Sequence, residues 1–142
     1  MFSKTCEYGI KAVLFIAHKS QKDQRVGVKE IAAAIGCPEA FTGKIMQQLS
    51  KNRVVQSIKG RSGGFWINEE DRLKINLQQI VKILDGDKLY KDCVLGLAQC
   101  NDANPCPMHE HYMNIKEAIT KMHVKTTIED LSTSINSKTI LR

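Results

Sequence analysis

Apolar residues recur at helical spacing in three successive stretches of the N-terminal half of the chain. The first stretch covers residues 3–19. The second, VGVKEIAAAIG, places Ile31 and Ile35 on one helical face and ends at Gly36, a residue type that readily forms a left-handed helix stop. Pro38 then opens a third helix that ends near residue 51. The pattern predicts a long first helix followed by two helices joined by a tight turn.

The second and third of these helices are typical of a helix-turn-helix, in which the later helix enters the major groove of DNA. The apolar face of the third helix consists of Phe41, Thr42, Ile45, Met46 and Leu49. The opposite face carries small, polar and cationic residues: Ala40, Gly43, Lys44, Gln47, Ser50 and Lys51. Lys44, Gln47 and Lys51 are therefore candidate DNA-binding residues, although a solvated surface helix has the same pattern.

A β-hairpin is predicted directly after the third helix. The segments VVQSI and FWI are rich in β-branched and aromatic residues, and they flank the basic, glycine-rich turn KGRSGG. A hairpin in this position is a wing. Lys59 and Arg61 are expected at its tip, and Gly63 and Gly64 would let the backbone approach a phosphate closely.

The C-terminal half contains a fourth predicted helix that Asn76 caps, then a loop, then a long helix with a heptad pattern. The apolar positions of the long helix are four and three residues apart in alternation: Met108, Tyr112, Ile115, Ile119, Met122 and Thr126. Such a stripe favours pairing with a second copy of the chain, and the alternative is packing against its own domain. A capping box at Thr127 predicts a last short helix.

The loop before the long helix reads CVLGLAQCNDANPCPMH and carries the candidate chemistry. It holds Cys93, Cys100 and Cys106, with His109 close behind, among small, polar and turn-forming residues. Five cysteines is an odd number, and the bunching of three in one loop favours metal or redox chemistry over a disulfide framework, in a reducing, cytoplasmic location. The other two, Cys6 and Cys37, are predicted to be small buried residues.

Charge divides the chain into two parts. Residues 1–76 contain 13 Lys/Arg against 7 Asp/Glu, whereas residues 77–142 contain 8 of each, so all of the net +6 lies in the first part. This asymmetry favours a nucleic-acid partner for a DNA-binding domain at 1–76, with the cysteine loop and a dimerisation region at 77–142. No apolar run is long enough to span a membrane, and no arrangement of residues indicates an enzyme or a small-molecule substrate.

The order of elements resembles the Rrf family of bacterial winged-helix transcription regulators over residues 1–131. The most specific features are the wing, QSIKGRSGGFWI, and the position of the three cysteines; the Glu7-Tyr8-Gly9 and KEIAAAIG segments are also similar. The resemblance implies a mainly α fold with a small β-hairpin wing, that is, a winged helix-turn-helix domain plus a long C-terminal dimerisation helix. It also implies a homodimer that binds double-stranded DNA, with an affinity controlled in some members by an iron–sulfur cluster.

Three thiolates do not complete the usual four ligands of such a cluster. In one branch of the family the resemblance implies a histidine, here His109, on a 2Fe–2S cluster. In another it implies an acidic residue from the partner subunit, here Glu7. A 4Fe–4S cluster is a further alternative, and zinc is compatible with three cysteines and one histidine.

The leading hypothesis is a cytoplasmic regulator whose affinity for its operator responds to redox state, nitric oxide or iron–sulfur status. One alternative is a small iron–sulfur or zinc protein that acts in redox or electron transfer. Another is a cluster-free regulator of the same fold that responds through its thiols.

Overall fold

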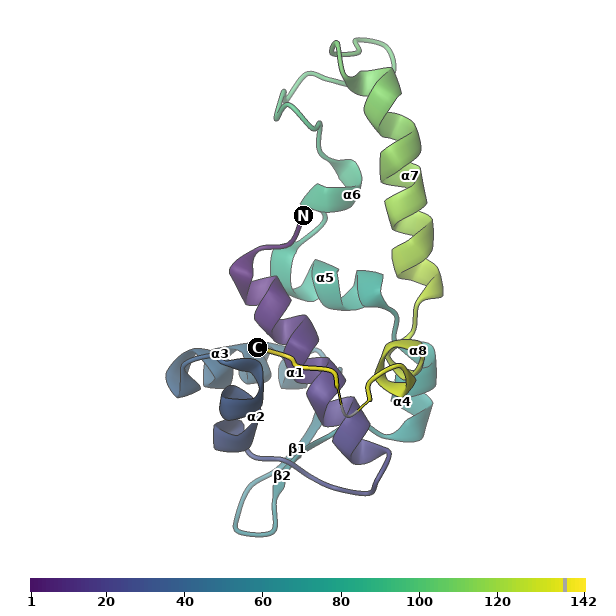
Figure 1. Cartoon of the computed structure of the whole chain (residues 1–142). Helices are drawn as coiled ribbons and strands as arrows, with labels where there is room; N and C mark the ends of the chain where they lie inside the picture. Colours follow the sequence, from purple (N-terminus) through teal and green to yellow (C-terminus); the bar gives the residue numbers. More distant parts are fainter. Residues whose placement is uncertain (137) are drawn as a thin grey trace.

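The computed structural model describes residues 1–136 and 138–142, and within them it is mostly helical with one two-stranded antiparallel sheet (Figure 1). This confirms the predicted fold class. No helix in these residues is long and apolar enough to cross a membrane. The elements are α1 (Lys4–Ser20), α2 (Val28–Ile35), α3 (Glu39–Lys51), β1 (Gln56–Ile58), β2 (Gly64–Trp66), α4 (Glu69–Lys74), α5 (Leu77–Asp85), α6 (Lys88–Lys91), α7 (His109–Lys125) and α8 (Ile128–Thr133).

The hydrophobic core is built around α1, which packs against α2, α3, α5 and α8. Ser3 caps this helix by accepting a hydrogen bond from the backbone N–H of Cys6. Ile16 of α1 is buried together with Ile45 of α3, Ile80 of α5 and Ile128 of α8. The last helix, α8, therefore packs on α1 of the N-terminal half. The boundary between a DNA-binding domain at 1–76 and a cysteine-loop and dimerisation region at 77–142 stays a prediction.

The helix-turn-helix forms as the sequence predicts. Gly36 ends α2 in the left-handed conformation, with φ of 66°, and its N–H donates to the carbonyl oxygen of Ala32. Pro38 is the N-cap of α3 rather than its first helical residue. The predicted inward face of α3 is buried at Thr42 and at the apolar residues Ile45, Met46 and Leu49.

The wing is shorter than the sequence pattern suggests. Strand β1 begins at Gln56, whereas Val54 and Val55 are buried in the core and the N–H of Val54 donates to the carbonyl oxygen of Leu49 in α3. Within the hairpin, Gln56 pairs with Trp66 and Ile58 with Gly64. The backbone of the segment before α2 joins on the other side, where Val26 exchanges two hydrogen bonds with Phe65, of 3.1 and 2.7 Å. The wing is thereby anchored to the core.

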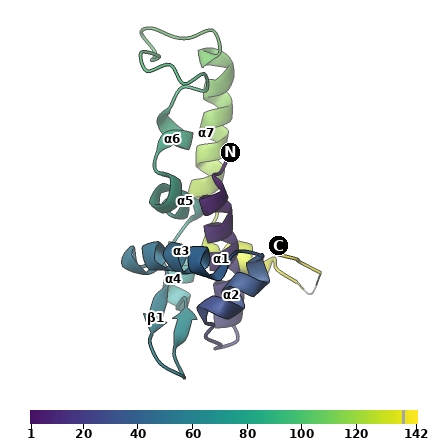
Figure 2. The ribbon, with the colours of Figure 1, turned by 90° about the vertical axis from the view of Figure 1, so that its left-hand side faces the viewer.

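Helix α7 stands away from the core and carries the cysteine loop at its far end, opposite the wing (Figures 1 and 2). At its base the chain forms a bridge, in which the N–H of Leu77 donates to Thr126 and that of Ile128 donates to Ile75, both at 2.9 Å. Along its length α7 packs against α5 and α6. The capping box predicted at Thr127 is present and starts α8.

Candidate metal centre and nucleic-acid interface

The cysteine loop is a series of tight turns. The N–H of Gly96, whose φ is +71°, donates to the carbonyl oxygen of Cys93 at 2.9 Å, and a further turn brings the N–H of Cys100 to Leu97 at 3.2 Å. The N–H of His109, the first residue of α7, donates to Cys106 at 3.0 Å. The turn-forming residues between the cysteines therefore fold the loop back on itself, as their composition predicts.

This folding brings the predicted donor atoms together. The sulfur atoms of Cys93, Cys100 and Cys106 all lie within 4.8 Å of one another, and those of Cys93 and Cys106 are 3.5 Å apart. His109 joins this group through Cys100, whose sulfur lies 3.3 Å from the histidine Nδ1. Three thiols and an imidazole are a donor set that suits zinc or an iron–sulfur cluster.

The pKa values of Cys93 and Cys100 shift in opposite directions. The pKa of Cys93 is lowered to about 7, chiefly because the backbone N–H of Leu97 hydrogen-bonds its sulfur, with a further N–H from Leu95. The backbone N–H of Cys106 lowers the pKa of Cys100, but burial and the neighbouring thiols of Cys106 and Cys93 outweigh it, so that the net direction is upward. Cys93 therefore ionises more readily than Cys100 and is ready to act as a thiolate ligand or nucleophile near neutral pH.

The two candidates for a fourth ligand lie in different surroundings. His109 begins α7 directly after the loop, and its second ring nitrogen, Nε2, contacts the Asp102 carboxylate at 3.0 Å, a contact that the sequence pattern did not reveal. Glu7 lies in the first turn of α1 and pairs with Lys4 at 2.9 Å, and this hydrogen bond lowers the pKa of its carboxyl group. Of the two, His109 is the one that the fold of a single chain brings to the thiols.

The candidate DNA-binding residues lie at the opposite end of the molecule. Lys44, Gln47 and Lys51 are exposed on the outer face of α3, and Lys59 and Arg61 are exposed in the turn of the wing. Between α3 and the wing runs a groove of about 460 Å³, whose lining includes Gly43, Gln47, Ser50, Lys59 and Phe65. The structure therefore gathers these predicted residues on two adjacent elements.

The two wing glycines shape the hairpin. A Cβ atom on Gly63 would lie 2.0 Å from the carbonyl oxygen of Ile58, within the same hairpin. One on Gly64, whose φ is +131°, would lie 2.9 Å from the carbonyl oxygen of Val26. Both clashes are with backbone, which has little room to move, so only glycine closes the wing at these positions.

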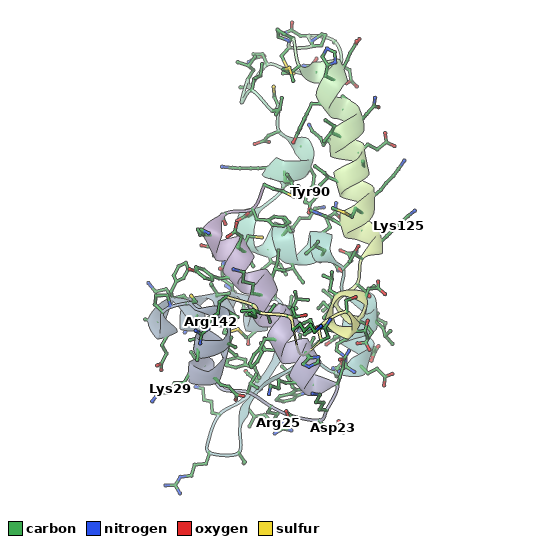
Figure 3. The ribbon with its side chains drawn as sticks, in the orientation of Figure 1. Asp23, Arg25, Lys29, Tyr90, Lys125 and Arg142 are labelled. Carbon is green, nitrogen blue, oxygen red and sulfur yellow. The ribbon has the colours of Figure 1, made fainter. Side chains whose placement is uncertain are left out.

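Two basic residues next to the wing were missed by the sequence reasoning. The Arg25 guanidinium stacks over the Trp66 ring, 4.3 Å from its centroid, and Lys29 is exposed at the start of α2. Both lie at the end of the molecule that carries the wing (Figure 3). The available signal is positional: Arg25 lies just before the second predicted helix, and Lys29 lies within it.

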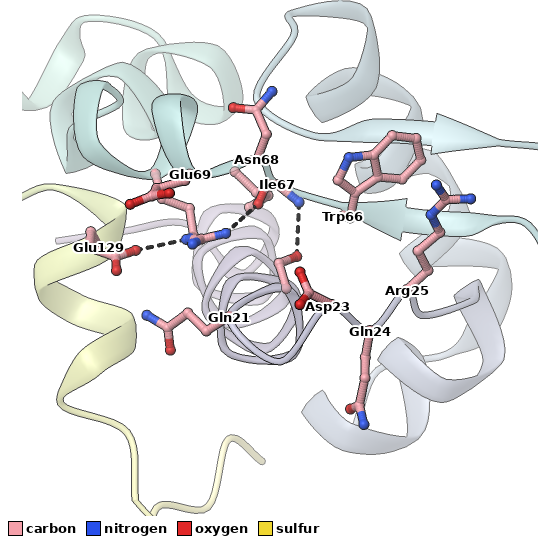
Figure 4. A pocket seen from close by; sticks show the side chains of 11 residues that line it. Gln21, Asp23, Gln24, Arg25, Trp66, Ile67, Asn68, Glu69 and Glu129 are labelled. Atoms are coloured by element: carbon pink, nitrogen blue, oxygen red, sulfur yellow. Dashed lines mark hydrogen bonds and ion pairs between the residues drawn. The ribbon is translucent and has the colours of Figure 1, made fainter.

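A cleft of about 700 Å³ lies between the end of α1, β2, α4 and α8 (Figure 4). At its floor Arg72 is only 8% exposed; its Nε donates to Glu129 at 2.7 Å and its Nη1 to the carbonyl oxygen of Ile67 at 2.8 Å. The hydroxyl of Ser20 accepts from the N–H of Ile67 at 2.9 Å. These contacts fasten the base of the wing to α1 and α8, and none of the predicted functional residues lines the cleft.

A helix-turn-helix followed by a basic hairpin, with a separate loop that leads into a long helix, defines a winged-helix DNA-binding protein. The model of the Rrf2 family, described as iron-dependent transcriptional regulators, matches residues 2–134, and the chain belongs to this family. Its relatives are transcription regulators and not enzymes, as the sequence predicted.

Comparison with individual proteins agrees with this assignment. An HTH-type transcriptional regulator of Aquifex aeolicus is 35% identical over 92% of this chain and 90% of its own. The regulator IscR of Yersinia pseudotuberculosis is 25% identical over 94% of this chain and 78% of its own. Among solved structures, CymR of B. subtilis, a global cysteine regulator, superposes with a TM-score of 0.79 at 24% identity, covering 96% of this chain and 98% of its own. The last likeness shows the fold alone.

Proposed function

We propose that this transcription regulator binds duplex operator DNA as a homodimer, and that an iron–sulfur cluster held by Cys93, Cys100, Cys106 and His109 controls its affinity. The observation that carries the proposal is the convergence of the three sulfur atoms within 4.8 Å, with an imidazole nitrogen beside them. The family description as iron-dependent and the similarity to IscR support it. We favour a 2Fe–2S cluster over a 4Fe–4S cluster, because the family branch that implies a histidine ligand implies it on a 2Fe–2S cluster.

When bound, such a cluster supplies a group that responds to oxidation or nitric oxide by changing its ligation. The chain contributes N–H groups of Leu95 and Leu97 that stabilise negative charge on the Cys93 sulfur. It also contributes a non-thiolate ligand, which protonation releases more readily than a thiolate. The chain thus combines firm anchoring at the cysteines with one labile position.

The homodimer is proposed from α7. Three residues lie at heptad spacing, Met108 at the N-cap of this helix and Ile115 and Met122 within it, and their exposed fractions are 41%, 52% and 52%. A second copy of α7 packed along this stripe would bury them. Because the cysteine loop leads directly into α7, a change in the loop at one end of the helix would alter how two DNA-binding halves are spaced at the other.

The test compares operator affinity with and without the cluster. Anaerobically reconstituted protein is expected to absorb visible light and to bind operator DNA with an affinity that changes when the cluster is removed. A variant with Cys93, Cys100 and Cys106 replaced by alanine should lose both the absorption and the change. Gln99→Ala, an exposed change in the same loop, serves as the matched control. Equal operator binding by the reconstituted protein and the triple variant would contradict the sensing role.

A second candidate is a cluster-free regulator that responds through its thiols, and the contact between Cys93 and Cys106 favours it. Their sulfur atoms are 3.5 Å apart, so a small movement reaches the bond length of a disulfide, about 2.05 Å. Oxidation would join the two sulfurs with release of two protons and two electrons to an oxidant such as a disulfide or peroxide. Iron and acid-labile sulfide analysis of anaerobically purified protein distinguishes the candidates, since only the first requires both.

A further inference from the structure

The segment between Cys100 and Cys106 forms a turn that fixes the position of Asp102. Asn101 and Asn104 exchange backbone hydrogen bonds of 3.3 and 3.1 Å across this turn. The side-chain oxygen of Asn101 also accepts from the N–H groups of Ala103 and Asn104, both at 2.9 Å. Asp102 therefore lies at a defined point of the loop even though its side chain is 91% exposed.

From this position Asp102 contacts one side of the His109 ring while a thiol occupies the other. Its carboxylate oxygen is 3.0 Å from Nε2, and the sulfur of Cys100 is 3.3 Å from Nδ1. An ionised carboxylate only accepts hydrogen bonds, so Nε2 carries the proton in this contact. In the neutral ring the other nitrogen, Nδ1, then presents its lone pair to the thiols. The histidine side chain is only 17% exposed, so its orientation is constrained.

We propose that Asp102 is a positioning residue for the metal centre, which holds His109 with Nδ1 as the ligand atom. The inference rests on the proposed function, because it takes His109 as the fourth ligand. A histidine that binds a metal commonly donates its other ring N–H to a carboxylate, which orients the ring and raises its basicity. Asp102 has that place here, within the loop that supplies the thiolates. The arrangement makes His109 a ligand without a residue from a second subunit.

The experiment is a Co²⁺ titration of the reduced, metal-free full-length protein, followed by thiolate-to-cobalt absorption. Asp102→Ala is expected to weaken Co²⁺ binding about 10–100-fold, the range found when such partners are removed. Asp102→Asn, which keeps an oxygen acceptor but loses the charge, should fall between wild type and Asp102→Ala. Glu110→Ala, which removes an exposed carboxylate next to His109, is the matched control and should bind as wild type.

The decisive comparison repeats Asp102→Ala in a His109→Ala background. If Asp102 acts through His109, it causes no further loss there, whereas a role only in shaping the loop gives the same loss in both backgrounds. Equal losses, or no loss from either single change, would overturn the proposal. The proposed function fails in a different way, by an operator affinity that ignores the cluster while Co²⁺ binding still depends on Asp102.

Discussion

Replacement of Arg72 by methionine is expected to destabilise the protein by about 3 kcal/mol, because two charge-assisted hydrogen bonds are lost in a largely buried place. Methionine retains the apolar stem of the side chain but removes the bonds to Glu129, at 2.7 Å, and to the Ile67 carbonyl, at 2.8 Å. Bonds of this kind contribute about 1.5–3 kcal/mol each. The side chain of Glu129 is 24% exposed and can bind water once Arg72 is replaced, so the expected loss lies at the low end of the sum of the two bonds.

The assay is urea denaturation with calorimetry on the metal-free protein. At roughly 3 °C per kcal/mol for a chain of this size, the melting temperature of Arg72→Met should fall by about 9 °C. Glu129→Gln leaves an oxygen acceptor, so its loss should be smaller, about 1–2 kcal/mol. The exposed pair of Lys74 and Glu70 is the control, since Glu70→Gln should change nothing measurable. A loss below about 0.5 kcal/mol for Arg72→Met would refute the reasoning, because desolvation would then cancel the attraction.

Four further outcomes are expected. Replacement of Lys59 and Arg61 by glutamine should reduce the slope of log affinity against log salt by about 1.8 per protomer. Two Lys→Gln changes in α6 should leave this slope unchanged. The same slope in the wing variant and in wild type would rule out phosphate contacts at the wing tip. In metal-free protein, alkylation of Cys93 followed by mass spectrometry should rise with pH around 7, since its pKa is lowered to about 7; a midpoint above pH 8 would contradict this. Burial lowers the pKa of His123 below its usual 6.5, so as the pH falls the unfolded state binds the proton before the folded state does. The free energy of unfolding should therefore decline as the pH falls below 6.5. His123→Gln should flatten this decline, and an unchanged pH dependence in the variant would contradict the role of His123. Gly43→Ala should raise stability by about 0.5–1 kcal/mol in urea denaturation, because the added methyl group meets nothing within 4 Å and alanine favours a helix; a loss of stability would show a hidden clash.

The elements that the sequence predicts well are those whose signals are local. Ile31 and Ile35 define the buried face of α2, and Gly36 ends it in the left-handed conformation that glycine favours. Thr127 and Asp130 form the capping box of α8 without help from the rest of the chain. The three thiols are near neighbours in a turn-rich loop, so their convergence also follows from sequence alone.

The features that the sequence does not reveal depend on tertiary contacts. Helix α4, EEDRLK, has an arginine as its buried residue, so no apolar periodicity marks it. The ion pair between Arg72 and Glu129 joins residues 57 positions apart. The contact of Asp102 with His109 depends on how two turns of the loop fold against the start of α7, which no spacing rule predicts. The fourth helix was predicted at residue 77, and α4 before it was missed.

The bridge at the base of α7 fixes one end of this helix, and the cysteine loop lies at the other end. The N–H of Leu77 donates to Thr126 and that of Ile128 to Ile75, so the base of the helix is held beside the segment that joins α4 to α5. Seventeen helical residues extend about 25 Å from this bridge, so a 2 Å displacement of the loop would correspond to a tilt of about 5° and would have to move α7 against α5 and α6. Shortening α7 by whole turns would therefore bring the cysteine loop closer to the bridge and change the tilt that corresponds to a given displacement of the loop. The wing and α3 would stay as they are.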